Sequence, residues 1–164
     1  MEARVLLGSV TPLRRDCGML CRQACCRADE DGLGGMVLFP GEEALYRPLP
    51  EGFQIQTDDS VTEGAFLLAC AGTCRREDRP LACRIFPLAF TATDSGVGVS
   101  PDPRAWPVCP LMPSGMEGLS DKFVAHARQA AGLLWENPGI QAFIKAQQAY
   151  IERYTKAPWE EGIL

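Results

Sequence analysis

The chain has 164 residues with a net charge of −5, and 46% of its residues are hydrophobic. This length and apolar content suffice for one globular domain with a buried core, which excludes a mainly disordered chain. The acidic balance argues against a nucleic-acid partner, because phosphate binding needs a basic surface. Nor does any apolar run approach the roughly 18 residues of a membrane span, so we expect no membrane partner.

The chain begins with a short apolar segment at residues 4–13, which we interpret as a strand that ends at Thr11-Pro12. Its acidic second residue and short apolar run do not fit a secretory signal, which favours a reducing, cytoplasmic compartment. In that compartment, clustered cysteines more often bind metals or act in catalysis than form disulfides.

The first cysteine group crowds four thiols into ten residues, CGMLCRQACC at 17–26. If this segment is one helix, Cys17, Cys21 and Cys25 lie along one stripe, and Cys26 points about a quarter-turn away. Converging thiols are what a soft metal ion or an iron–sulfur cluster requires. The spacing leaves open whether the four sulfurs form one site or contribute to two.

Short strands are predicted through the middle of the chain. Alternating or buried apolar runs place them at 36–40, 53–57 and 65–70, and a hairpin at 84–93 and 97–100 turns at Asp94-Ser95-Gly96. Turn residues separate each run from the next, so we expect short antiparallel strands.

The second cysteine group is C-x3-C-x8-C at Cys70, Cys74 and Cys83, followed by Cys109. A thiolate cluster carries negative charge, so neighbouring arginines would lower the cost of that charge and keep the cysteines deprotonated. Arg84 directly follows a cysteine, and we expect it to lie nearest to the metal site.

The remainder of the chain is a proline-rich segment followed by helices. Five prolines in 101–113 predict an ordered, extended arm, with Trp106 covering the core or the metal site. A capping box at Ser114 and Glu117 predicts a helix start, and apolar stripes predict two antiparallel helices that meet at Asn137-Pro138. The predicted fold is therefore a single α+β domain. Its cysteine-rich α/β region spans 1–113, and its helical hairpin spans 114–164.

The cysteine pattern resembles a known family, the zinc- or iron-chelating cysteine-cluster proteins, which include the cysteine-rich domain of flagellin lysine N-methylase. That family has an early cluster ending in Cys-Cys, then a cysteine, an Arg-Pro and a Cys-Arg-x-Phe/Tyr-Pro. The corresponding residues are Cys17, Cys21, Cys25, Cys26, Cys74, Arg79, Pro80, Cys83, Arg84, Phe86 and Pro87. The resemblance covers about residues 16 to 110 and implies metal or iron–sulfur binding.

All eight cysteines are candidate metal ligands: Cys17, Cys21, Cys25, Cys26, Cys70, Cys74, Cys83 and Cys109. We expect a [4Fe–4S] cluster, used for electron transfer or in support of a protein-modifying reaction, with a protein substrate or redox partner. The first alternative is Zn²⁺ in a structural or interaction module, since C-x3-C spacing also suits zinc. The second is a component related to protein lysine N-methylases, which only one branch of the family implies.

Overall fold

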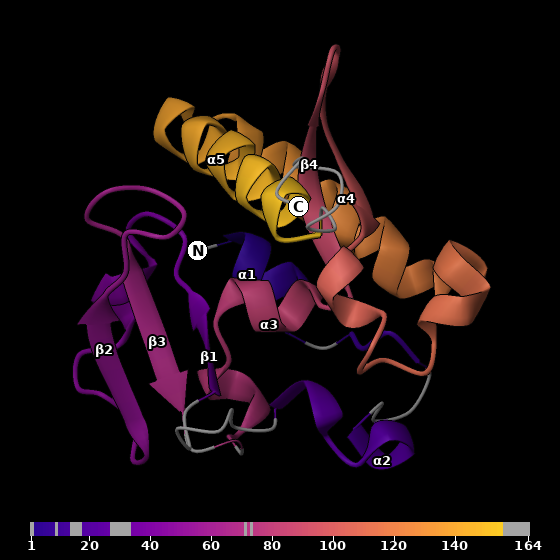
Figure 1. Cartoon of the computed structure of the whole chain (residues 1–164), viewed down its shortest axis with the longest axis horizontal. Helices are drawn as coiled ribbons and strands as arrows, with labels where there is room; N and C mark the ends of the chain where they lie inside the picture. The colour runs from indigo at the N-terminus through magenta and orange to yellow at the C-terminus, as the bar shows by residue number, and fades with distance from the viewer. Residues whose placement is uncertain are drawn as a thin grey trace, which may run out of the picture.

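The structure is a computed structural model that describes residues 2–8, 10–13, 18–26, 34–70, 72 and 74–155. It combines helices with short antiparallel strands and ends in a helical pair, which confirms the predicted α+β class (Figure 1). Within these residues, no helix is both long enough and apolar enough to cross a membrane.

A three-stranded antiparallel sheet carries one wall of the cysteine region. Its order is β1 (Gly34–Val37), β3 (Phe66–Cys70) and β2 (Phe53–Thr57). The predicted strands at 53–57 and 65–70 are thus confirmed to within a residue, while the strand predicted at 36–40 lies at 34–37. The register sets Cys70 opposite both Gly34 and Phe53, so the second cysteine group begins where the central strand ends.

The predicted hairpin forms between β4 (Leu88–Thr93) and β5 (Gly96–Pro101), but its first strand does not begin at residue 84. Residues Leu81–Ile85 form a single helical turn instead, α3, which Pro80 precedes. Pro87 has no backbone N–H to continue that helix. Cys83 therefore projects from a helix rather than from a strand.

The N-terminal segment is helical, so its interpretation as a strand is wrong. Helix α1 (Glu2–Leu6) places Ala3 on its buried face, and Leu7, four residues later, continues that face into the core. This spacing is the helical one, and the face packs against the C-terminal helix α4 (Asp121–Trp135). Tertiary packing decides the conformation of a segment this short.

The first cysteine group is also not one continuous helix. Helix α2 (Gly18–Cys21) stops at Arg22 and Gln23, which have φ angles of 49° and 58°. The chain then forms one 3-10 turn, η1 (Ala24–Cys26). The positive φ angles break the helical periodicity, so the predicted stripe of three sulfurs is wrong. Cys17 lies outside the described residues.

The helical pair consists of α4 and α5 (Pro138–Thr155), and Asn137 Oδ1 caps α5 by accepting hydrogen bonds from the backbone nitrogens of Gly139 and Ile140. The start of α4 was predicted wrongly. Ser114 and Glu117 lie in the 3-10 segment η5 (Met112–Gly118), and Leu119 is extended, so α4 begins only at Asp121.

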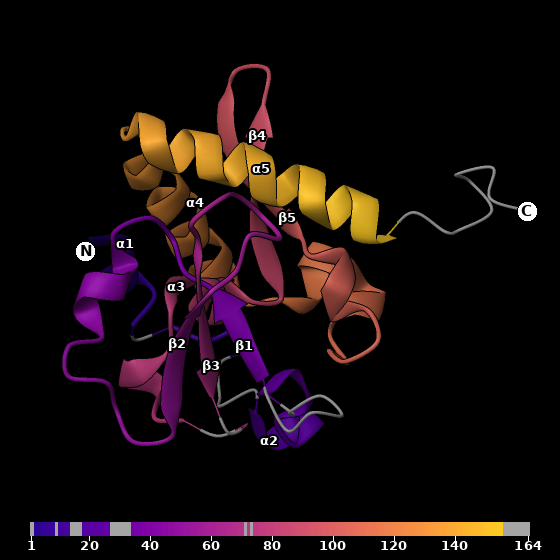
Figure 2. The ribbon, with the colours of Figure 1, turned by 60° about the vertical axis from the view of Figure 1, so that its left-hand side comes forward.

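The proline-rich segment is not an extended arm. It contains the 3-10 turn η4 (Pro103–Ala105), where the Asp102 carboxylate accepts hydrogen bonds from Arg104. The Trp106 side chain is 56% exposed, so it does not cover the core as predicted. Figures 1 and 2 both place α2 and the end of β3 at one end of the molecule, with α5 at the other.

Candidate metal centre

Five cysteines from four separate segments line one cavity of about 160 Å³. They come from η1, from the end of β3, from the loop after it and from α3: Cys25, Cys26, Cys70, Cys74 and Cys83. The remaining walls are mostly apolar and include Met36, Phe53 and Phe86. We call this cavity the first cysteine pocket.

Local structure explains how the sheet contributes to this pocket. Strand β1 approaches β3 closely at Gly35, where a Cβ atom would lie only 2.9 Å from the carbonyl oxygen of Leu68. After β3, Gly72 has a φ of 82°, a conformation that glycine adopts at little cost. Cys70 and Cys74, two positions before and after this glycine, line the same cavity.

The charges of neighbouring thiols act on two of the cysteines in this pocket, Cys74 and Cys83. Burial raises the pKa of Cys83 above its ordinary value, and the neighbouring charges of Cys26, Cys74 and Cys70 raise it further. Burial likewise raises the pKa of Cys74, and Cys26 and Cys70 again add to the shift. We call Cys26, Cys70, Cys74 and Cys83 the central cysteines.

Cys26 behaves differently because it has a thiol neighbour. Its Sγ atom lies 3.8 Å from the Sγ of Cys25, and either thiol can donate to the other. The hydrogen bond from Cys25 lowers the pKa of Cys26 to about 6, with a further lowering by the charge of Arg79, against the raising effect of burial. A thiolate at Cys26 is therefore accessible near neutral pH, as a metal ligand requires.

Arg79 lines the first cysteine pocket and acts on its thiols, whereas Arg84, which we expected nearest to the metal, lines only the second cavity described below. The Arg79 guanidinium is within hydrogen-bonding reach of Cys74. Burial lowers the pKa of Arg79, but this contact and the charges of Cys74, Cys26 and Cys83 raise it overall. Among the residues that the structure describes, its buried Nε atom has no hydrogen-bond partner. A buried unsatisfied donor beside several thiols suits a negatively charged occupant of the pocket.

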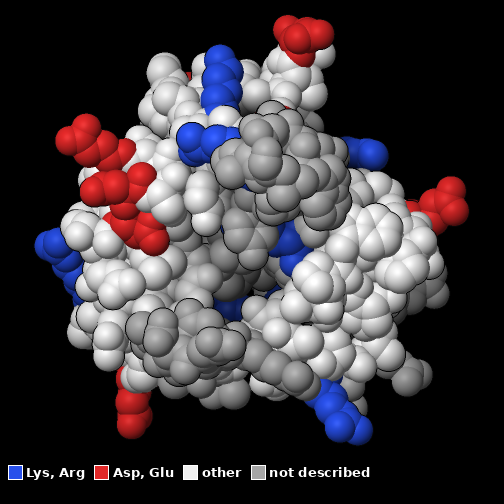
Figure 3. Space-filling model, in the orientation of Figure 1, with Lys and Arg blue, Asp and Glu red and all other residues white. Residues whose placement is uncertain are grey.

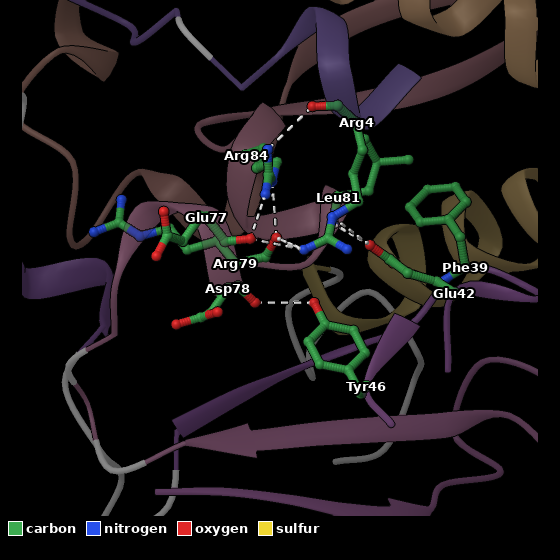
Figure 4. Close-up of polar contacts among 9 residues, drawn as sticks. All are labelled: Arg4, Phe39, Glu42, Tyr46, Glu77, Asp78, Arg79, Leu81 and Arg84. Carbon is green, nitrogen blue, oxygen red and sulfur yellow. Dashed lines mark hydrogen bonds and ion pairs between the residues drawn. The ribbon is translucent and has the colours of Figure 1, made fainter. Parts of the chain in front are cut away.

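Arg84 instead holds the backbone. Its guanidinium donates to the carbonyl oxygens of Arg79 at 2.8 Å, Glu77 at 2.8 Å and Arg4 at 3.0 Å (Figure 4). Arg4 in turn donates to the carbonyl oxygens of Glu77 and Arg79. These bonds fasten the loop before α3 to α1, and so they fix the position of Arg79.

Two further side chains hold the same loop from the other side. Tyr46 donates its hydroxyl to the carbonyl oxygen of Asp78 at 3.0 Å, and Glu42, in the 3-10 turn η2 (Glu42–Leu45), accepts from the backbone nitrogen of Leu81 (Figure 4). Burial raises the pKa of both side chains. Sequence reasoning missed Glu42, Tyr46 and Arg4, because their role depends on contacts between residues 32 to 75 positions apart.

A second, smaller cavity of about 40 Å³ adjoins the first. Cys21 and Cys109 line only this cavity, and Cys25 and Cys83 line both. Three arginines also border it: Arg76, Arg79 and Arg84. Figure 3 shows Lys and Arg atoms at the bottom of a hollow on this face of the molecule. The seven described cysteines thus meet around two adjoining cavities rather than one.

The thiols do not form a finished coordination shell. Within the described ranges, no three Cys, His, Asp or Glu side chains lie close enough together to hold one metal ion. The donor set nevertheless fits a soft metal, since it is all sulfur, is bordered by cationic arginine and is enclosed by apolar side chains. His126 is not among the lining residues of either pocket; its Nδ1 atom is 2.7 Å from the carbonyl oxygen of Lys122.

Comparisons with protein-family models, with curated proteins and with solved structures found no match to this chain.

Proposed function

We propose that this chain is a metal-binding protein that holds an iron–sulfur cluster in its first cysteine pocket. The ligands in this proposal are the central cysteines, Cys26, Cys70, Cys74 and Cys83. This proposal rests on the meeting of five cysteines from four separate segments around one cavity. In a reducing compartment, clustered cysteines more often bind a metal or act in catalysis than form disulfides.

The charges around the pocket support this proposal. Four thiolates are costly to hold together, and the charges of Cys26 and Cys70 add to the effect of burial in raising the pKa values of Cys74 and Cys83. Iron or zinc would offset it by neutralising the sulfurs. Arg79 supplies a further positive charge from outside the ligand set, which is the role that residues around iron–sulfur sites commonly have.

The size of the cavity favours a cluster over a single ion. Its volume of about 160 Å³ is similar to that of an engineered cavity of about 150 Å³ that accommodates benzene. A single Zn²⁺ ion surrounded by four sulfurs at about 2.3 Å needs no such space. When bound, a [4Fe–4S] cluster supplies one-electron transfer. The central cysteines would hold it, and Met36, Phe53 and Phe86 would limit access of water.

A zinc-binding structural module is the second candidate. The spacing of Cys70 and Cys74 favours it, because two cysteines separated by three residues match the short ligand spacing of zinc sites, and both line this cavity. In this case the metal would link β3 to α3 and to η1, and the protein would need no redox partner.

The resemblance of the cysteine pattern to the chelating cysteine-cluster family supports metal binding in either form. A protein substrate or a redox partner, and a relation to protein lysine N-methylases, remain proposals that rest on this resemblance. We also propose a cytoplasmic location, supported by the free thiols of Cys26, Cys70, Cys74, Cys83 and Cys109.

Purification without oxygen, followed by analysis of iron, acid-labile sulfide and zinc, tests the proposal. Equal amounts of iron and sulfide in a brown protein are the expected result. A colourless protein with stoichiometric zinc would select the second candidate. A chain that takes up neither metal after reconstitution, and that unfolds identically with and without a chelator, would overturn both.

A further inference from the structure

Cys25 and Cys26 form an adjacent thiol pair at the edge of the first cysteine pocket. Their Sγ atoms are 3.8 Å apart. Cys25 is exposed and Cys26 is partly buried, so a small oxidant reaches the pair through Cys25. We propose that this pair is an oxidative modification site, which a peroxide converts to a reversible disulfide between neighbouring residues.

The oxidation of this cysteine pair by a peroxide proceeds in two steps. The sulfur of Cys25 bonds to one peroxide oxygen as the O–O bond breaks, and the thiol proton leaves with the other oxygen as water or an alcohol. This step gives a sulfenic acid. The sulfur of Cys26 then attacks the sulfur of Cys25, the S–O bond breaks and a second water leaves with the Cys26 proton. Both cysteines are oxidised, and the peroxide is reduced.

The surrounding backbone permits this change. The two cysteines lie in the short turn η1, which contains no buried residue, so its rearrangement disturbs no core packing. The preceding residues Arg22 and Gln23 already depart from helical geometry. Consecutive Cα atoms are about 3.8 Å apart, whereas most disulfides join Cα atoms about 4.4–6.8 Å apart. A disulfide at this position is therefore strained, and strained disulfides are readily reduced again.

Oxidation would also affect the proposed metal centre, and this part of the inference rests on the proposed function. Cys26 is one of the four central cysteines and lines the first cysteine pocket together with Cys70, Cys74 and Cys83. A disulfide with Cys25 takes Cys26 out of this set and leaves three free thiols around the pocket. The modification thus links the oxidation state of η1 to release of the metal.

The sequence offers a direct test of the disulfide, because Arg22 and Arg27 flank the pair. Trypsin releases the peptide QACCR, residues 23–27, which contains these two cysteines and no other. The metal-free, reduced chain is treated with hydrogen peroxide, then alkylated and digested. We expect QACCR to lack two hydrogens, to carry no alkyl group and to recover both thiols after treatment with dithiothreitol. A QACCR peptide alkylated on both cysteines, or linked to the peptide DCGMLCR at 16–22, would overturn the proposal.

The link to the metal is tested on the zinc-loaded chain, since Zn²⁺ has no redox chemistry of its own. We expect one zinc centre to be lost for each QACCR disulfide formed, and the Cys25→Ser variant to retain its zinc at the same peroxide concentration. Equal zinc loss from the variant and the native chain would overturn the link. A chain that binds no metal but still forms the disulfide would remove the proposed function and leave the modification site in place.

Discussion

The Oε1 oxygen of Glu42 accepts a hydrogen bond from the backbone nitrogen of Leu81 at 2.7 Å, and so joins η2 to the start of the helix that carries Cys83. The other carboxylate oxygen, Oε2, accepts from the backbone nitrogen of Phe39 at 3.3 Å. The carboxylate is buried, with Arg4 3.6 Å away. One side chain thus connects the strand region to the wall of the first cysteine pocket.

Replacement of Glu42 by glutamine should destabilise the fold. Glutamine has only one acceptor oxygen, so its NH₂ group would face the N–H of either Phe39 or Leu81. An unsatisfied buried donor costs about 1–3 kcal/mol, which we expect as the loss of unfolding free energy in urea. Glu51→Gln, at an exposed position, is the matched control and should change stability by less than about 0.5 kcal/mol. Equal stability of the two variants would contradict this role of Glu42.

The same residue predicts a pH dependence. Burial raises the pKa of Glu42 above 4.5, against the lowering effects of its two backbone hydrogen bonds and of Arg4 and Arg84. The folded chain therefore holds this proton more tightly than the unfolded chain does, and stability falls as pH rises from 4.5 to the raised pKa. Above that pKa the contribution is constant. The difference in unfolding free energy between native chain and Glu42→Gln should follow this course; a difference that rises with pH would contradict it.

Features set by neighbouring residues were predictable from the sequence. The alternation of apolar and polar residues in 53–57 was enough to predict β2. Asn137 followed by Pro138 was enough to predict the turn between α4 and α5. The gathering of distant cysteines was expected from thiol chemistry alone. Helices α1 and α3 were not predictable, because each is only five residues long and depends on packing against other elements.

The role of each arginine likewise could not be predicted from the sequence. Arg84 follows Cys83 directly, yet its guanidinium donates to three backbone carbonyl oxygens. Arg79 lies four residues before Cys83 and acts on the thiols instead. The difference comes from α1, whose residue Arg4 lies 75 positions away from Arg79 in the chain. No local pattern carries information over that separation.

Removal of the Arg84 guanidinium should therefore lower stability more than it lowers metal affinity. Arg84→Met keeps most of the apolar stem and removes three charge-assisted hydrogen bonds. We expect a loss of about 3 kcal/mol or more in urea unfolding of the metal-free chain. Arg75, whose side chain is 73% exposed, provides the control variant Arg75→Met, which should leave the unfolding free energy nearly unchanged. A stable Arg84→Met variant with weakened metal binding would instead give Arg84 the role that we assign to Arg79.

Removal of the Arg79 charge should instead lower metal affinity more than it lowers stability. Arg79→Gln takes a cation away from Cys74, Cys26 and Cys83, and residues of this kind around a metal site typically contribute about 10- to 100-fold to affinity. We expect a loss of this size in competition with a zinc chelator, with Arg79→Lys retaining more affinity than Arg79→Gln. Arg75→Gln removes an exposed charge from the same loop and should leave the affinity unchanged. Equal affinities for Arg79→Gln and Arg75→Gln would show that the Arg79 charge does not act on the metal.

The two cysteine pockets differ in their expected effect on metal content. Cys83 belongs to the central cysteines and lines both cavities, whereas Cys109 lines only the smaller one. Cys83→Ser should lose the metal and with it the stability that metal binding contributes, because metal-binding energy is also folding energy in such sites. Cys109→Ser should retain the metal of the first pocket.

This comparison needs a measurement that separates loss of metal from loss of fold. Metal analysis is therefore paired with unfolding of both variants and the native chain in excess chelator. If Cys83 acts through the metal, the metal-free forms of Cys83→Ser and the native chain should unfold at similar denaturant concentrations, and only the metal-loaded forms should differ. Metal lost from Cys109→Ser but retained by Cys83→Ser would move the metal centre to the second cavity, because Cys109 borders that cavity alone.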